Sequence, residues 1–224
     1  MAVTIKEGRR IYENIKKSIL FLLPTSFAEG LIIAFTILSQ QEMPLQATQL
    51  FWINMVSAIT IQFAFIFEPA ERGIMNRPPR QNGKSLMNAH DGFQMFYVSV
   101  LTAITSLLAH DWLLAQGADR VTANTMMVVN IIIMSKIFYL FSIRTSSMAF
   151  SKEFFTNRKL FLIISVMLLL QCILFYVPFM QQSFQTEPLT VLEWSVSIIA
   201  GLVVLGVAEL DKFIRLKIQS SKRN

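Results

Sequence analysis

Charge and cysteine are both scarce in this sequence, and each shortage excludes a class of protein. Only 15% of the residues are charged, whereas soluble domains average about 25%. Cys172 is the one cysteine and sits inside an apolar run, so the sequence gives no disulfide framework and no Cys/His spacing of a transition-metal site. It also has no glycine-rich phosphate-binding loop. These shortages, with a mean hydropathy of +0.51, place the chain among membrane proteins.

Long apolar runs take the place of the charge. Hydrophobic residues make up 54% of the chain, and a helix needs about 20 apolar residues to cross the hydrocarbon core. Because lipid offers the backbone no hydrogen-bond partners, runs of this length are predicted to be helical. The sequence therefore predicts an all-α membrane protein, a bundle of six transmembrane helices, with spans at about 18–38, 48–67, 93–114, 121–143, 160–180 and 189–209.

Lysine and arginine predict the orientation of this bundle. Apart from Arg120 and Lys136, they all lie in four segments, 1–17, 68–92, 144–159 and 210–224. By the positive-inside rule, both termini and the two longer loops face the cytoplasm. The net charge of +6 then lies beside anionic lipid, and no nucleic-acid partner is expected. We predict a multi-pass protein of the cell membrane, plasma or inner, with the lipid bilayer as a partner.

Tryptophan agrees with this orientation. Trp52, Trp112 and Trp194 lie near the predicted outer ends of the second, third and sixth spans, where an indole meets both lipid and water. His110, close to Trp112, is interpreted as an interfacial polar residue. Gln171, inside the fifth predicted span, is interpreted as a helix-packing residue.

Glu29 is the first ionisable residue that points to a function. It lies in the middle of the first predicted span, where charge is costly and marks a functional site by default. A lone carboxylate there is strongly desolvated unless it is protonated, paired or bound to a cation. Pro24, five residues earlier, frees a backbone carbonyl that could also face an ion. The alternative is a protonated Glu29 that is hydrogen-bonded between helices.

Two charged segments carry a resemblance to a known family. EGRRIYENIKK at Glu7–Lys17, followed by two apolar spans, and EPAERGIMNRPPR at Glu68–Arg80 are similar to the carboxy-terminal transmembrane domain of P-type cation-transporting ATPases of the calcium- and sodium-pump type. The resemblance covers nearly all of residues 7–212. It implies a cytoplasmic stalk helix at 1–17, a membrane domain at 18–212 and a basic cytoplasmic tail at 213–224.

The family transports ions by phosphorylating a soluble domain, and that domain uses ATP and magnesium. The aspartyl-phosphate motif DKTGT does not occur in these 224 residues, and no catalytic residue is assigned. The resemblance implies that the phosphorylation and nucleotide-binding domains belong to another part of a longer product, joined in cis or in trans. This chain alone is not expected to hydrolyse ATP.

The resemblance also implies a set of cation ligands. On the first span the family carries an Asn, two residues and then a Glu; Glu29 matches that Glu, and Ser26 replaces the Asn. On the second span the family reads W-x-N-L-V-T-D and this chain reads WINMVSA, so Asn54 is kept, Ser57 substitutes for Thr, and Ala58 stands where the central Asp should be. Calcium takes roughly six to eight oxygens. No metal site is therefore firmly assigned, and the ion is expected to be a proton or a monovalent cation held by Glu29, Asn54, Ser57 and Ser26.

Lys136 is the second unusual group. It lies inside the fourth predicted span, eight residues before Arg144 or about 12 Å along a helix. The family tends to carry a Gln or Glu at this position, near the ion sites. Lys136 could snorkel towards the interface, find another partner, or pair with Glu29 as a built-in cation, in which case the two groups titrate together. Such a pair would set selectivity by discouraging divalent ions.

Two functions from different classes follow from these observations. The first is the membrane transport domain of a P-type cation-transporting ATPase, forming part of the ion pathway. The alternative is a non-catalytic membrane protein derived from such a pump, a scaffold or regulatory partner, which the missing Asp and the missing soluble domains favour. A stand-alone secondary transporter ranks third, because the sequence has none of the inverted repeats of that class.

Overall fold

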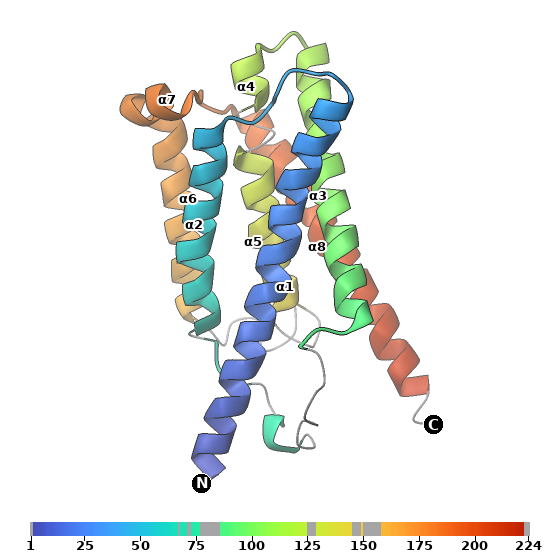
Figure 1. Ribbon diagram of the computed structural model, residues 1–224. Coiled ribbons are helices and arrows are strands. Elements are labelled where there is room, and N and C mark those ends of the chain that lie inside the picture. Colours follow the sequence, from blue (N-terminus) through green and yellow to red (C-terminus); the bar gives the residue numbers. More distant parts are fainter. Residues whose placement is uncertain are drawn as a thin grey trace.

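The computed structural model is a bundle of long helices (Figure 1). It describes residues 2–66, 68–70, 73–76, 86–124, 129–144, 149 and 158–221. Six helices in these ranges are long and apolar enough to cross a membrane, and the same ranges contain no strand. The predicted all-α bundle of six spans is thereby confirmed. Parts of the Glu68–Arg80 segment and the last three residues of the predicted tail lie outside the described residues.

The elements follow one another as α1 (Ala2–Leu38), α2 (Ala47–Ile66), the short 3-10 helix η1 (Ile74–Asn76), α3 (Ala89–Ala115), α4 (Arg120–Asn124), α5 (Ile132–Ile143), α6 (Arg158–Tyr176), α7 (Pro178–Phe184) and α8 (Val191–Ser221). Both chain ends lie at one end of the bundle, which we call the terminal end; α4 and α7 lie at the other, the loop end (Figure 1).

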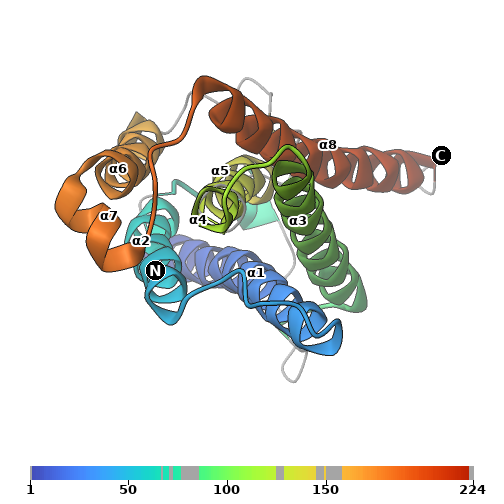
Figure 2. The same cartoon turned by 90° about the horizontal axis from the view of Figure 1, so that it is seen from above.

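Helix α5 is the centre of the bundle. Seen from above, the other long helices surround it (Figure 2). In the span Arg120–Ile143, 87% of the most apolar window is buried, against 33–50% in the other five candidate spans. Most polar side chains on α5 are therefore enclosed by neighbouring helices.

Pro24 stands in the interior of α1, and side chains from two other helices compensate for it. A proline has no N–H to give to the carbonyl four residues earlier, here that of Leu20. The Tyr139 hydroxyl of α5 donates to this carbonyl over 3.2 Å, and the Phe21 ring stacks on the Tyr139 ring. From α3, Ser99 donates to the carbonyl of Pro24 itself over 2.9 Å. Helix α1 thus continues past Pro24 as one piece, from Ala2 to Leu38, and Glu29 lies in its membrane-spanning part.

The terminal end of the bundle ties α1 to α2 and α5. The side chains of Glu68, just past α2, and Arg144, at the end of α5, form a buried ion pair of 2.7 Å. Helix α1 holds both neighbours: Lys17 donates to the carbonyl of Arg144 over 2.6 Å, and Asn14 donates to the carbonyl of Glu68 over 3.2 Å. Because α1 is unbroken between Asn14 and Glu29, a displacement of its polar part is transmitted directly into the bundle.

Several helix boundaries differ from the predicted spans; α3, for example, begins at Ala89, four residues before the predicted start at 93. Helix α6 ends at Tyr176, four residues before the predicted window closes, because Pro178 cannot continue it and instead opens the short helix α7. Helix α8 continues to Ser221, twelve residues past the predicted end at 209. Its polar extension needs no apolar length, so hydropathy gave no signal of it.

Candidate cation site

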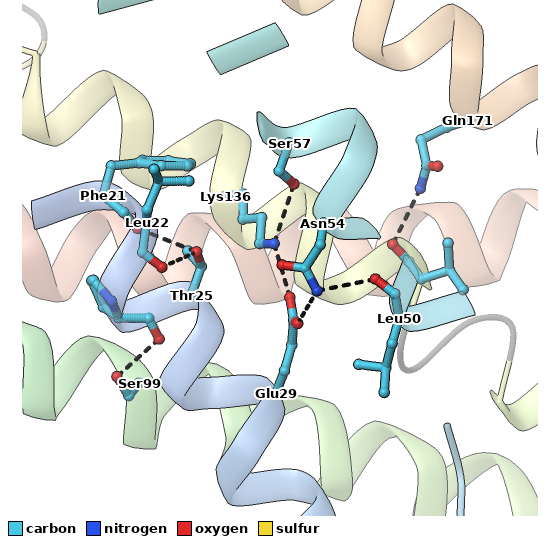
Figure 3. Close-up of polar contacts among 12 residues, drawn as sticks. Phe21, Leu22, Thr25, Glu29, Leu50, Asn54, Ser57, Ser99, Lys136 and Gln171 are labelled. Carbon is cyan, nitrogen blue, oxygen red and sulfur yellow. Dashed lines mark hydrogen bonds and ion pairs between the residues drawn. The ribbon is translucent and has the colours of Figure 1, made fainter. Parts of the chain in front are cut away.

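An ion pair between two helices forms the middle of the candidate site. Lys136 of α5 places its ammonium nitrogen 2.9 Å from Glu29 Oε1 of α1. Both side chains are buried, with 1% and 6% of their surfaces exposed. Of the alternatives that the sequence left open for Lys136, the structure has the pairing with Glu29. Figure 3 shows the two side chains pointing at each other across the gap between the helices.

Helix α2 supplies the remaining contacts. Lys136 Nζ also donates to Ser57 Oγ over 3.1 Å, and the amide of Asn54 donates to Glu29 Oε2 over 2.7 Å (Figure 3). The same amide reaches the carbonyl of Leu50, at 3.0 Å. Ser57 is buried, whereas Asn54 lies on the exposed face of α2. Three helices thus meet at one carboxylate, and both of its oxygens accept a hydrogen bond.

Two positions that the family resemblance singled out lie apart from this cluster. Ser26 is exposed on α1, although it is only three residues from Glu29; Thr25, its buried neighbour, donates back to its own helix at the carbonyls of Phe21 and Leu22. Ala58 is half-buried beside Ser57 and offers no oxygen. The buried stripe of α1 passes through Thr25 and Glu29, and Ser26 falls just outside it.

The pair is electrically neutral as a unit but costly to open. Taking two ions out of water costs several kcal/mol each, so a buried pair is stable only where good geometry and further hydrogen bonds satisfy both partners. Here Asn54 and Ser57 supply those hydrogen bonds. The cluster thus pairs its one carboxylate with a lysine from the same chain.

The donor set that these helices offer is small. Within the described ranges, no group of three or more His, Cys, Asp or Glu side chains is placed to hold a metal ion. One carboxylate, one amide and one hydroxyl fall short of the roughly six to eight oxygens that calcium takes. With Ala58 in the position of the family's Asp, the second carboxylate that a divalent ion needs is not supplied by α2.

A polar link joins α2 to α6. Trp52, near the start of α2, is 6% exposed, and its indole N–H donates to Gln171 Oε1 over 3.2 Å. Gln171 in turn donates to the carbonyl of Val129 over 3.1 Å (Figure 3). Gln171 is thus the packing residue that the sequence indicated, and it is also the acceptor that lets Trp52 be buried. Hydropathy cannot reveal such a partner, because it reads one segment at a time.

Known proteins share this sequence over nearly its whole length. The family described as "Cation transporting ATPase, C-terminus" matches residues 42–214. The "Probable cation-transporting ATPase F" of Mycobacterium tuberculosis (strain ATCC 25618 / H37Rv) is 32% identical over 96% of this chain and 24% of its own length. "Cation-transporting ATPase pma1" of Synechocystis is 27% identical, over 92% of this chain and 23% of its own length. The "Calcium-transporting ATPase" of Bacillus subtilis is 25% identical, over 94% and 23%.

This chain spans about a quarter of the length of the curated relatives it matches. The part of this chain that the relatives match contains the six candidate spans and the Glu29–Lys136 cluster. The chain therefore belongs to the cation-transporting ATPase C-terminal family, and it is a multi-pass membrane domain of the P-type cation-ATPase kind.

Proposed function

We propose that this chain is the transport domain of an ATP-driven cation pump and that Glu29 binds the transported ion, a proton or a monovalent cation. The observation that carries this proposal is the buried pair between Glu29 of α1 and Lys136 of the central helix α5. Ionisable groups at this depth are costly and mark ion pathways. The remaining domains of the pump, which would use ATP and magnesium, are proposed as partners in cis or in trans, and the cell membrane as the location.

The pair would work as an exchange between an internal and a transported cation. In this arrangement Lys136 occupies Glu29. A proton that binds to Glu29 removes the negative charge and releases Lys136; a monovalent cation must displace the ammonium and then has Ser57 Oγ, freed from Lys136, as a neutral ligand. When the ion leaves, Lys136 returns to the carboxylate. Two such states with different ion affinity are what a pump requires.

Lys136 would also set the charge of the ion. At an effective dielectric constant of 20, two unit charges 4 Å apart interact by about 4 kcal/mol, and a divalent ion doubles the repulsion from a nearby ammonium. A second carboxylate to offset this is not provided by Ala58. We therefore propose selectivity for single charges.

Helix α1 would connect the site to the motor. Its polar half, residues 2–17, holds the ends of α2 and α5 through Asn14 and Lys17 and continues into Glu29 without a break. A tilt of α1 driven by phosphorylation elsewhere would move Glu29 relative to Lys136. Opening of the pair would in this way follow the phosphorylation state.

A closed ion pair also favours the second candidate, a non-catalytic relative that keeps the fold as a scaffold. In that case Lys136 would permanently neutralise Glu29 and no ion would exchange with it. The two candidates differ in one measurable respect, namely whether the Glu29 carboxylate is needed for turnover.

The test is ion-dependent ATP hydrolysis and ion uptake by the complete pump in proteoliposomes. Glu29→Gln keeps the size of the side chain and is expected to abolish uptake. Glu193→Gln is the matched control, because Glu193 is also buried in a span but only accepts from the backbone N–H of Thr190 at the start of α8. Uptake by Glu29→Gln at the wild-type rate would refute the transport role of Glu29.

A further inference from the structure

Asn130 is fully buried, and neither polar atom of its side chain has a hydrogen-bond partner among the described residues. An amide side chain carries two N–H donors and one oxygen acceptor. Buried polar groups in folded proteins are almost always hydrogen-bonded, and an exception indicates an ion or a buried water. An entire unpartnered amide in the interior of a bundle therefore points to bound water.

The backbone around Asn130 is also irregular. Residues 129–131 have π-helical geometry where the chain leads into α5. The carbonyl of Val129 accepts from Gln171 of α6, over 3.1 Å, instead of being left open by the wider turn. Such π turns occur most often at functional sites. Asn130 thus lies at a widened turn, one of whose carbonyls is already served by a neighbouring helix.

Two serine hydroxyls, on α3 and α5, are also buried without a hydrogen-bond partner among the described residues. Ser135, next to Lys136 on α5, and Ser106, on α3, are buried and have no partner for Oγ in the described part of the chain. This is not the usual state of a serine in these helices. Ser99 of α3, for example, donates to the carbonyls of Met95 and Pro24.

These three side chains lie at the level of the ion pair or on its loop-end side. Asn130 precedes Lys136 by six residues, about 9 Å along the helix axis at 1.5 Å per residue. Ser106 lies seven residues, about 10 Å, beyond Ser99, which contacts Pro24; Glu29 lies five residues, about 7.5 Å, beyond Pro24 in the same direction. Ser106 is therefore within about one turn of the level of Glu29.

The loop end above Asn130 carries a protonatable pair. His110 Nε2 of α3 lies 3.1 Å from Asn124 Oδ1 of α4, and its side chain is 14% exposed. Asp111, beside it, is 64% exposed and reaches the other ring nitrogen at 3.3 Å. A titratable side chain thus lies near the surface, in contact with α4 at the loop end.

We propose that buried water at Asn130, Ser106 and Ser135 forms a proton route between the loop end and Glu29, with His110 at its mouth. This inference rests on the proposed use of Glu29 as the ion-binding group. A proton from bulk water is taken up by His110 or the first water, and each water that accepts one proton releases another inwards. The last acceptor is the Glu29 carboxylate, which becomes a carboxylic acid and gives up Lys136.

Hydration is tested first, by a method that does not depend on transport. In the complete pump in nanodiscs, Cys172→Ser removes the one native thiol of this chain, and Asn130→Cys and Ser135→Cys each place one new cysteine in it. Ile132→Cys is the matched control, because Ile132 is equally buried on α5 but apolar. X-ray radiolysis makes hydroxyl radicals from water in place. Oxidation at 130 and 135 is expected to be about tenfold faster than at 132, since only the former have buried water as neighbours. Equal, slow oxidation at all three would overturn the proposal.

A second variant, without a new cysteine, tests whether the site at Asn130 is hydrated. Asn130→Leu keeps the volume and removes the polar atoms. If the site is dry, this change removes two unsatisfied groups and raises the melting temperature; if it is hydrated, it expels bound water, does not raise the melting temperature, and slows proton uptake severalfold. A raised melting temperature with unchanged uptake contradicts the route. Slow oxidation of both cysteines, together with loss of uptake in Glu29→Gln, would refute the water route alone. Fast oxidation of both cysteines, together with normal uptake in Glu29→Gln, would refute the proposed function.

Discussion

The Lys136 ammonium lies 2.9 Å from the Glu29 carboxylate, and the two charges cancel between two buried side chains. A buried pair of this kind is neutral as a unit, while each partner alone is an uncompensated buried charge. This distinction separates variants that remove one charge from variants that remove both.

Removal of one partner is expected to destabilise the domain more than removal of both. Glu29→Gln or Lys136→Met alone should lower the free energy of unfolding by roughly 3–5 kcal/mol, because the other charge is left unpaired. The double variant Glu29→Gln/Lys136→Met should recover most of this loss. Thermal unfolding in detergent micelles measures all three.

The matched control for this cycle is an exposed pair on the same helix. Glu7 and Arg10 lie 2.8 Å apart with about half and a third of their side chains exposed, 46% and 34%. Glu7→Gln should change stability by less than about 1 kcal/mol, as is typical of surface pairs. Strictly additive losses at Glu29 and Lys136 would show that the two charges do not depend on each other.

The spans and the charged residues could be predicted because both follow from the cost of burial in lipid. Any helix that crosses needs a long apolar run, and any charge inside it stands out; Glu29 and Lys136 were identified in this way. The sequence offered the contact between them only as one of three possibilities for Lys136, because the contact joins residues 107 positions apart. It depends on how α1 and α5 are rotated, which no single segment encodes.

The rotation of α1 also explains why Ser26, which the family resemblance assigned to the site, lies on the exposed face. Three residues along a helix turn by 300°, so Ser26 and Glu29 are only about 60° apart around the axis. The edge of the buried stripe falls between them. The partner of the Trp52 indole N–H could not be predicted for a related reason, because it is the side chain of Gln171 on another helix.

Tyr139 is predicted to matter because of Pro24. Tyr139→Phe removes the donor to the carbonyl of Leu20 and should cost about 1–3 kcal/mol, since a buried carbonyl is left without a partner. Pro24→Ala restores a backbone N–H at this place, so Tyr139→Phe should cost much less in the Pro24→Ala background. Melting temperatures of the two single variants and the double variant form the cycle. An equal loss in both backgrounds would mean that the Tyr139 hydroxyl does not compensate for the proline.

The contact between α5 and α8 is predicted to depend on a missing side chain at Gly201. A Cβ there would collide with the Phe138 ring and lie 3.0 Å from the carbonyl oxygen of Met134. Gly201→Ala should therefore destabilise by about 1–3 kcal/mol, as overpacked contacts do. Gly206, five residues further along α8, has open space at the same point, and Gly206→Ala should be neutral or gain up to about 1 kcal/mol in helix propensity. Chemical denaturation of both variants compares them directly; equal effects would show that the helices can separate without loss.

Ion selectivity is predicted to change when both the missing carboxylate and the internal cation are altered. Ala58 is half-buried beside Ser57, which contacts Lys136. Ala58→Asp alone should give Lys136 a second anionic partner and lower turnover, because the ammonium is held more tightly. Ala58→Asp together with Lys136→Gln leaves two carboxylates and no fixed positive charge, which suits a divalent ion better. ATP hydrolysis by the complete pump should then gain stimulation by calcium.

Ala58→Asn with Lys136→Gln is the matched control, since it has the same shape without the charge. Equal calcium stimulation in both double variants would show that the second carboxylate does not decide which ion is bound.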